Sequence, residues 1–241
     1  MSAVVVIPCR AGSRGVPGKN RAEVNGSPLF LWSVAAALEC EDVRTVCVTT
    51  DDEEILSWGK WAASKNNRIN CVSRPKEMAT DESPTESCLF HACDQNSVGN
   101  HEYVVLLQPT SPFRHGALIR KCITAASNSG SSFTAIAPGH IMWLHGVHAS
   151  MPLYDPEKRP RRQDSVHSPV VAFEDGNIYC SLYSQMKTTK TRFGDSPKLV
   201  LSTLIHSVQI DSTEDLELVR DLAQCKQVNE WMQNVQILLP K

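Results

Sequence analysis

Glycine and basic residues crowd the segment IPCRAGSRGVPGKNR at residues 7–21, which directly follows the apolar residues 3–6. Three glycines recur every three residues and allow the backbone to turn tightly and expose its N–H groups: Gly12, Gly15 and Gly18. Four basic side chains lie in the same segment: Arg10, Arg14, Lys19 and Arg21. Clustered cations and exposed N–H groups suit a polyphosphate, so the segment predicts a polyphosphate-binding loop, with an ordinary solvated turn as the alternative.

Two familiar phosphate-binding motifs do not fit this loop. The Walker A motif has four residues between its glycines and Ser or Thr after its lysine. Here five residues separate Gly12 from Gly18, and Asn20 follows Lys19. The dinucleotide fingerprint GxGxxG is also absent from the segment. The loop therefore represents another way of holding a phosphorylated ligand.

Segments with strand and helix character alternate after the loop. We expect strands at residues 3–8, 43–49, 69–73, 103–107 and 133–137. We expect helices at residues 28–40, 52–64, 84–95 and 116–127. Repeated units of this length predict an α/β fold with a doubly wound, mostly parallel sheet of the Rossmann-like type.

The loops that follow strands in such a sheet lie at the same edge as the opening segment. Ligands bind outside the carboxyl ends of parallel strands, where helix N-termini expose unpaired N–H groups. The loops at 49–52 and 108–114 both follow expected strands. We therefore expect them to meet the segment 7–21 around one binding site.

The alternation breaks at about residues 140–175, where His, Pro and Arg are dense. The sequence FEDGNIYCSLY at 173–183 then has turn and strand character, and the chain returns through KLVL and HSVQI to a helix that begins near Thr213. We expect one domain at 1–225, with an excursion at about 140–185, and a C-terminal helix and tail at 226–241.

Composition excludes several classes of protein. The chain of 241 residues has 41% apolar and 21% charged residues, as soluble globular proteins do. Its formal net charge of −2 gives no overall attraction for nucleic acid. The longest apolar stretch, at 29–38, is about half of what crosses a bilayer, and no basic leader precedes the first apolar run. We expect a cytoplasmic protein, with neither nucleic acid nor membrane as a partner.

The ordered motifs resemble the acylneuraminate cytidylyltransferases, or CMP-sialic acid synthetases. The N-terminal motif of that family has the form I-P-A-R-x-G-S-K/R-G-I/L-P-x-K-N, and IPCRAGSRGVPGKN differs by Cys9 for Ala and by Arg14 for the commoner Lys. Further blocks match in order up to about residue 222: GSPLFLWSVAAAL, TTDDEEI, SRPKEMATDESPTES, LLQPTSPFR, KRPRRQD, EDGNIY and IDSTEDLELV.

This resemblance implies a nucleotidyltransferase that uses CTP. Enzymes of the family join CTP to a nine-carbon 2-keto sugar acid, release pyrophosphate and require Mg²⁺. The anomeric hydroxyl of the sugar attacks the α-phosphorus, and cations must face the phosphate oxygens as charge spreads over them. The implied nucleotide-binding residues are Arg10, Gly12, Arg14, Lys19, Asn20, Arg74, Thr80 and Gln108. The implied catalytic residues are Arg10, Lys19 and Asp211.

The resemblance also implies a sugar site that a homodimer completes. Its residues are Gln108, Arg162, Gln163, Asp175 and Tyr179. The excursion KRPRRQD matches a part of the family that forms the dimer and reaches the sugar site of a neighbouring subunit; a guanidinium suits the sugar carboxylate. A solvated basic loop or a nuclear-import signal are the alternatives for this stretch. Asp175 stands where the family has Asn, a change that can alter the choice of sugar.

The expected metal ligand departs from the family in one of two positions. The family commonly has Asp-Ile-Asp where this chain has QIDSTED. Asp211 is kept and is the expected Mg²⁺ ligand, whereas Gln209 replaces its partner, so we expect weaker metal binding or the loss of a second metal. Asp211 as the N-cap of the following helix is the alternative, and both roles can coexist.

Several functions remain open at this point. The sugar can be a sialic, legionaminic or pseudaminic acid, and SRGVP favours the first two. An enzyme that activates the eight-carbon sugar Kdo has a different opening motif, and Gly12, Gly15 and Asn20 argue against it. A catalytically silent nucleotide-binding relative is a third possibility, suggested by Gln209 and Asp175.

Overall fold

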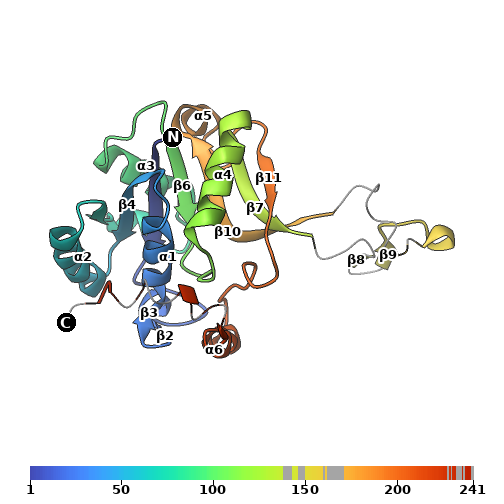
Figure 1. Ribbon diagram of the computed structural model, residues 1–241, viewed down its shortest axis with the longest axis horizontal. Coiled ribbons are helices and arrows are strands. Elements are labelled where there is room, and N and C mark those ends of the chain that lie inside the picture. Colours follow the sequence, from blue (N-terminus) through green and yellow to red (C-terminus); the bar gives the residue numbers. More distant parts are fainter. Residues whose placement is uncertain are drawn as a thin grey trace.

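The computed structural model describes residues 1–137, 143–145, 150–159, 161, 171–226, 228, 230–231, 235 and 237–239. Seven strands form the central sheet: β1 (Ala3–Cys9), β4 (Val43–Thr50), β5 (Ile69–Ser73), β6 (Tyr103–Leu107), β7 (Ser131–Ile136), β10 (Phe173–Leu182) and β11 (Lys198–Leu201). Their order across the sheet is β11-β7-β10-β6-β1-β4-β5 (Figure 1). All neighbours pair in parallel except at β10, which is antiparallel to both β6 and β7. The prediction of a mostly parallel α/β sheet is therefore confirmed.

Six helices and three 3₁₀ turns are described around this sheet. The helices are α1 (Leu29–Leu38), α2 (Glu53–Lys65), α3 (Thr85–Gln95), α4 (Gly116–Ser129), α5 (Tyr183–Thr189) and α6 (Thr213–Leu222). The 3₁₀ turns are η1 (Lys19–Arg21), η2 (Lys76–Met78) and η3 (Pro156–Lys158). Two small hairpins pair β2 (Glu23–Val24) with β3 (Ser27–Pro28), and β8 (Trp143–His145) with β9 (Ser150–Pro152). The segment 206–210, expected to help return the chain, contains no strand.

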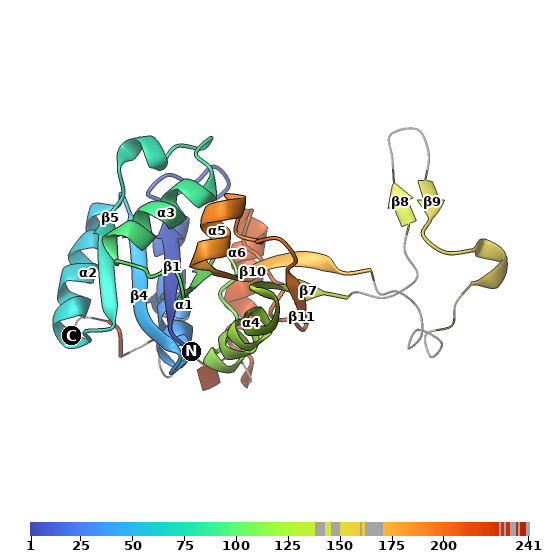
Figure 2. The same cartoon turned by 90° about the horizontal axis from the view of Figure 1, so that it is seen from above.

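Alternating side chains of the central strands serve two separate cores. In β1, Val5 packs with α1, α2, α4 and α6 on one face, whereas Val4 and Val6 pack with α3 and α5 on the other. Figure 2 shows helices on both sides of the sheet. A fully buried aliphatic side chain contributes about 1.5–3 kcal/mol. Strands that are apolar on both faces thus hold the carboxyl edge in place.

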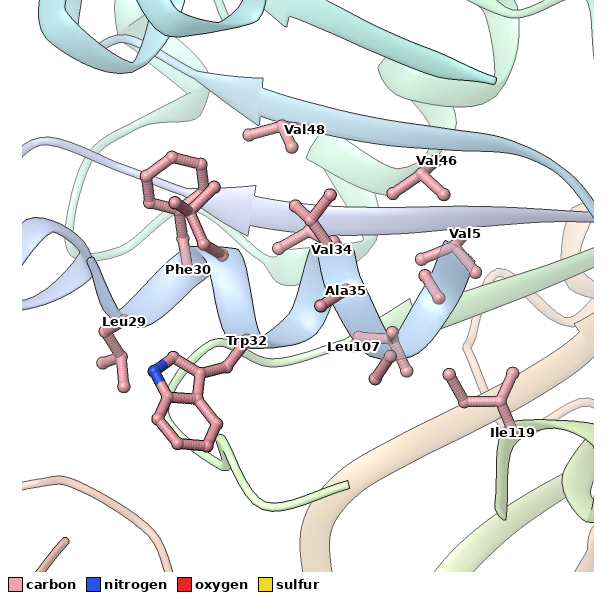
Figure 3. Packing of buried hydrophobic residues seen from close by; sticks show 14 of the residues in the cluster. Val5, Leu29, Phe30, Trp32, Val34, Ala35, Val46, Val48, Leu107 and Ile119 are labelled. Atoms are coloured by element: carbon pink, nitrogen blue, oxygen red, sulfur yellow. The ribbon is translucent and has the colours of Figure 1, made fainter. Parts of the chain in front are cut away.

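Helix α1 is buried over nearly its whole length, from Leu29 to Ala37. Both the strands β1 and β4 and the helix α4 contact α1. Figure 3 shows Val34 and Ala35 over the β-strands and Trp32 turned away from them. The Trp32 ring meets Phe113 edge to face at 5.7 Å. Helix α1 therefore supports both the loop that precedes it and the loop after β6.

An arm leaves the sheet between β7 and β10. It comprises the described residues 143–145, 150–159 and 161, and Figures 1 and 2 both show β8 and β9 far from the seven strands. The start of β10 pairs with the end of β7, Phe173 opposite Ile136. Because the chain leaves along one strand and returns along its neighbour, β10 must run antiparallel. The boundaries of the excursion and of the C-terminal helix and tail stay predictions.

The C-terminal part of the chain lies against α2. Trp58 donates a hydrogen bond from Nε1 to the carbonyl oxygen of Leu238 at 2.9 Å, and both Val235 and Leu238 are buried. A search of the described residues for a helix that could span a bilayer yields none.

Candidate active site

A cavity of about 320 Å³ lies outside the carboxyl ends of β1, β5 and β6. Three loops line it, and each follows one of these strands. Seven of the eight residues that the resemblance implied for the nucleotide are among its lining residues: Arg10, Gly12, Lys19, Asn20, Arg74, Thr80 and Gln108. The eighth, Arg14, is not in the lining and has a side chain that is 74% exposed. The opening segment and the loop at 108–114 therefore meet at one edge as expected, whereas the loop at 49–52 is not in the lining and the loop after β5 forms the third wall.

The opening loop owes its shape to close contacts as well as to its glycines. Gly15 lies so near the 210–211 segment that an added Cβ would stand 1.9 Å from the carbonyl oxygen of Asp211. Gly18 has φ of 64°, in the left-handed region that glycine favours, and begins η1. The backbone N–H of Ala11 donates to Asp51, and Asn20 donates to the carbonyl of Arg10. The loop is thus clamped between the sheet edge and a distant segment.

Lys19 is the basic residue that this clamp holds most firmly. Its ammonium donates to the carbonyl oxygen of Ile210 at 2.6 Å and lies 3.9 Å from Asp211 Oδ1. Burial lowers the pKa of Lys19, and the carboxylate of Asp211 opposes that shift. The backbone N–H of Ile210 donates to Thr110, so the same segment also touches the loop after β6. The structure therefore brings together Lys19 and Asp211, two expected catalytic residues that are far apart in the sequence.

Arg10 and Arg14 are joined by a carboxylate that sequence reasoning missed. Asp81 lies 2.7 Å from Arg10 Nη2 and 2.6 Å from Arg14 Nε, and it lines the same cavity. Arg10 also donates to the carbonyl oxygen of Thr80. The hydrogen bond and charge of Arg14 lower the pKa of the Asp81 carboxyl, and Arg10 adds a smaller shift in the same direction. No local signal distinguished Asp81 from its acidic neighbour Glu82, because the distinction arises only across the cavity.

Arg74 lies at the inner wall of the cavity with a side chain that is largely buried. One guanidinium nitrogen donates to the carbonyl of Thr49 at 2.7 Å. Nε is buried and has no hydrogen-bond partner among the described residues. A buried donor without a partner is costly unless a ligand or water satisfies it. Arg74 lines the cavity together with Thr85 and Cys88.

The loop after β6 is held by Arg114, another residue that sequence reasoning did not assign. Its guanidinium is 2% exposed and donates to the carbonyls of Gln108 and Ser111, to Ser33 and to Asn177. Burial lowers the pKa of Arg114 to about 9. QPTSPFR contains only one basic residue, and its burial could not be read from that loop. Arg114 therefore fixes where Gln108 meets the cavity.

The expected sugar residues are not gathered in the same way. Asp175 and Tyr179 are buried and do not line the cavity. Arg162 and Gln163 lie outside the described residues. Gln108, expected to touch both substrates, is in the lining. The sugar roles of all five residues stay predictions.

Asp175 and Tyr179 have polar partners within the protein. Asp175 accepts hydrogen bonds from Thr134 Oγ1 and Ser202 Oγ, each at 2.6 Å, and from the backbone N–H of Asn177. These contacts favour a structural role for its carboxylate. The hydroxyl of Tyr179 donates to Glu174. Burial raises the pKa of Tyr179, and the Glu174 carboxylate adds to that shift.

The two residues expected at the metal have different surroundings. The Asp211 side chain is 78% exposed beside Lys19. Gln209 donates its side-chain N–H to the carbonyl oxygen of Asp175. Within the described part of the chain, no three or more His, Cys, Asp or Glu side chains are placed to hold a metal ion. Asp211 as a metal ligand therefore stays a prediction.

The alternative reading of Asp211 as a helix N-cap is wrong. The N-cap of α6 is Ser212, whose hydroxyl accepts from the backbone N–H of Asp215. The Asp215 carboxylate accepts in turn from the backbone N–H groups of Ser212 and Asp211. This reciprocal capping box satisfies the helix start and leaves the Asp211 carboxylate outside it.

The strand order β5-β4-β1-β6 and the cation-rich loop after β1 define a nucleotide-binding α/β protein of the Rossmann-like type. The family model described as Cytidylyltransferase matches residues 4–232, and the chain belongs to this family. The resemblance drawn from the motifs is thereby confirmed.

Named relatives lie within the same family. The chain is 28% identical over 233 residues to CMP-N,N'-diacetyllegionaminic acid synthase of Legionella pneumophila, covering 94% of this chain and 98% of the relative. It is 26% identical over 235 residues to N-acylneuraminate cytidylyltransferase of Escherichia coli O18:K1:H7, covering 92% of this chain and 52% of the relative. The chain thus spans nearly all of the first relative and about half of the second.

Solved structures share the fold. A CMP:2-keto-3-deoxy-manno-octonic acid synthetase complexed with CTP superposes with a TM-score of 0.63 at 18% identity, covering 92% of this chain and 98% of that one. A 4-diphosphocytidyl-2C-methyl-D-erythritol synthase superposes with a TM-score of 0.65 at 9% identity, covering 92% and 99%. At these identities the likeness supports the nucleotidyltransferase fold alone.

Proposed function

We propose that this protein transfers CMP from CTP to the anomeric hydroxyl of a nonulosonic acid of the sialic type, giving a CMP-sugar and pyrophosphate. The observation that carries the proposal is the cavity at the carboxyl edge, where three loops bring together seven of the expected nucleotide residues. The names of the family and of its relatives supply the reaction class. That the acceptor is a sugar acid of the sialic type is part of this proposal.

In this proposal the triphosphate lies along the opening loop. Arg10 and Lys19 line the cavity, and Lys19 is fixed by the carbonyl of Ile210. A cation already aimed at the phosphates stabilises charge that develops when the sugar oxygen attacks the α-phosphorus. The bond from the α-phosphorus to the leaving oxygen then breaks, the proton of the attacking hydroxyl passes to water, and pyrophosphate carries away the negative charge. Preorganised cations of this kind typically contribute a factor of 10²–10³ in rate.

The cytidine half of the nucleotide would occupy the inner wall. Arg74, Thr80 and Gln108 line the cavity and carry polar groups suited to hydrogen bonds with a base. A cavity of about 320 Å³ is near the small end for ligand sites, so a single-ring base fits more readily than a purine. Gln108, held by Arg114 through its backbone, lies where the base and the sugar would meet.

Magnesium is the proposed cofactor, and the donors present fit it. Asp211 offers an exposed hard oxygen close to Lys19, and Mg²⁺ commonly binds one or two carboxylates together with substrate phosphates and water. When bound, the ion would neutralise charge on the phosphate oxygens. Gln209 is already bonded to the backbone of Asp175, so the chain supplies one carboxylate where the family commonly has two.

We further propose that the protein is a cytoplasmic homodimer in which the arm completes the sugar site with Arg162 and Gln163. Exposed apolar side chains on the arm and on its stem support this contact. They are Met151, Leu153 and Phe173, and they are 59%, 44% and 49% exposed. Apolar side chains gathered on a projecting element favour burial against another surface. A cytoplasmic location agrees with the use of CTP.

The test is a release assay for pyrophosphate. Purified protein, CTP and Mg²⁺ are incubated with N-acetylneuraminic, legionaminic, pseudaminic and Kdo sugars in turn. We expect pyrophosphate and a CMP-sugar with one of the nine-carbon acids, and little with Kdo. Binding of CTP by calorimetry without turnover on any sugar would contradict the enzyme and favour a silent nucleotide-binding relative.

A further inference from the structure

Asp81 links the two walls of the nucleotide cavity. Its two carboxylate oxygens contact different guanidiniums of the opening loop, one Oδ1 to Arg10 at 2.7 Å and the other Oδ2 to Arg14 at 2.6 Å. The partners lie about seventy residues earlier in the sequence, on the opposite side of the cavity. An anion of this protein therefore already holds the cations that the triphosphate is expected to use.

The position of Asp81 within the cavity determines what this pairing can do. Asp81 itself is among the residues that line the cavity, as is Arg10. Its side chain is 39% exposed, and that of Arg14 is 74% exposed. Ion pairs at such exposure are weak and exchange readily. A bound polyphosphate and the Asp81 carboxylate would compete for the same donors and repel each other.

We propose that Asp81 is a positioning residue that acts as an internal competitor of the triphosphate. It holds Arg10 and Arg14 across the empty cavity, gives them up when CTP binds, and takes them back when pyrophosphate leaves. This inference rests on the proposed use of CTP. The Asp81 carboxylate thus limits the affinity for polyphosphates and speeds the release of pyrophosphate.

The mechanism distinguishes ligands by whether they reach the two arginines. CTP and pyrophosphate must displace the carboxylate, whereas cytidine carries no phosphate and occupies only the inner wall. Removing the negative charge at residue 81 should therefore tighten the binding of the first two ligands and leave the third unchanged. A residue that merely supports the fold would weaken all three.

The experiment compares wild-type protein with Asp81→Asn by calorimetry, using inorganic pyrophosphate, CTP and cytidine as probes. We expect pyrophosphate and CTP to bind about 3- to 10-fold more tightly to the variant, and cytidine to bind within about twofold of wild type. In steady-state assays, KM for CTP and kcat should both fall, because pyrophosphate leaves more slowly. Asp81→Glu should restore affinities toward those of wild type.

Glu82→Gln is the matched control, since it removes the same charge one residue away. Glu82 is exposed and makes no ion pair among the described residues, so its affinities should equal those of wild type. Should Asp81→Asn melt well below wild type, Asp81→Ser takes its place. Equal or weaker binding of pyrophosphate by the folded variant would overturn the proposed role of Asp81 as a competitor. Wild-type protein that binds neither CTP nor pyrophosphate would overturn the proposed function as well.

Discussion

The nucleotide cavity and the arm region are organised in opposite ways. Around the cavity, Arg10 ties the loop after β1 to the loop after β5 through the carbonyl of Thr80, and Ile210 bonds both to Lys19 and to Thr110 in the loop after β6. At the arm, the chain leaves the sheet and presents exposed apolar side chains such as Met151. A parallel sheet delivers several loops to one edge within a single chain, whereas an extension from that sheet has no such scaffold. The two substrates are therefore expected to meet sites of different rigidity.

The largest expected effect comes from removing the best-held cation of the cavity. Lys19→Ala should lower kcat/KM about 10²- to 10³-fold, because it deletes a preorganised charge that faces the phosphates. Its melting temperature should remain near that of wild type. Arg220→Ala is a suitable control, since Arg220 is exposed and donates to the carbonyl of Glu23 away from the cavity. An unchanged rate in Lys19→Ala would remove this residue from the triphosphate site.

The clamp on the opening loop can be broken without changing any charge. In Gly15→Ala the new Cβ would lie 1.9 Å from the Asp211 carbonyl oxygen, so the loop and the 210–211 segment must move apart. We expect about a 10- to 100-fold loss in kcat/KM, since misplacement of about 1 Å has such consequences. Gly99→Ala is the control, because its added Cβ would meet only ordinary contacts with Glu102, the nearest at 3.6 Å, and Gly99 does not line the cavity. Equal effects of the two variants would contradict the clamp.

A histidine near the base of the loop after β6 should make stability depend on pH. His206 stacks on Trp231 at 5.6 Å, and burial, followed by His115, lowers its pKa to about 4. The nearby charged or titratable groups are His115, Arg114, Lys121 and Asp175. The unfolded state binds the proton at about pH 6.5 and the folded state only near pH 4, so stability is lost as pH falls through this window.

The size of that loss is about 1–3 kcal/mol at pH 4 relative to pH 7. Urea unfolding at several pH values measures it, and His206→Gln should flatten the pH dependence between about 6.5 and 4. His101→Gln, at an exposed histidine, should leave the profile as in wild type. If His206→Gln retains the full dependence, another group carries the titration.

The smallest expected effect concerns Gln209, which bonds to the carbonyl of Asp175 and lies two residues before the expected metal ligand Asp211. Gln209→Asp should lower the Mg²⁺ concentration for half-maximal rate a few-fold, since a second carboxylate strengthens the set of hard oxygen ligands. The same change deletes the hydrogen bond to the Asp175 carbonyl and should cost about 1 kcal/mol of stability. Gln209→Asn serves as the control for the lost bond. A Mg²⁺ titration identical to wild type would mean that residue 209 does not approach the ion.

Much of the cavity could be predicted because its signals are local. Glycines and cations within residues 10–20 describe an anion loop whatever surrounds them, and repeated strand and helix units imply parallel strands with loops at a common edge. These two facts predicted an anion-binding loop at that edge, whereas Arg74, Thr80 and Gln108 were implied by the resemblance to the family. Arg14 was the exception within this set, since its direction depends on Asp81 on the opposite wall.

By itself, the sequence determined the class of fold, the chemistry of the opening loop and the edge at which ligands bind, because periodicity and residue type act over short stretches of chain. Only the tertiary structure decided that Asp81 faces the arginines, that Arg114 is buried beneath Gln108, that β10 runs antiparallel and that Gln209 bonds to Asp175. Arg114 is only six residues from Gln108 but bonds to the distant Ser33 and Asn177, and the other contacts also join residues far apart in the chain. Their pairing depends on how two whole layers pack, and no local pattern records it.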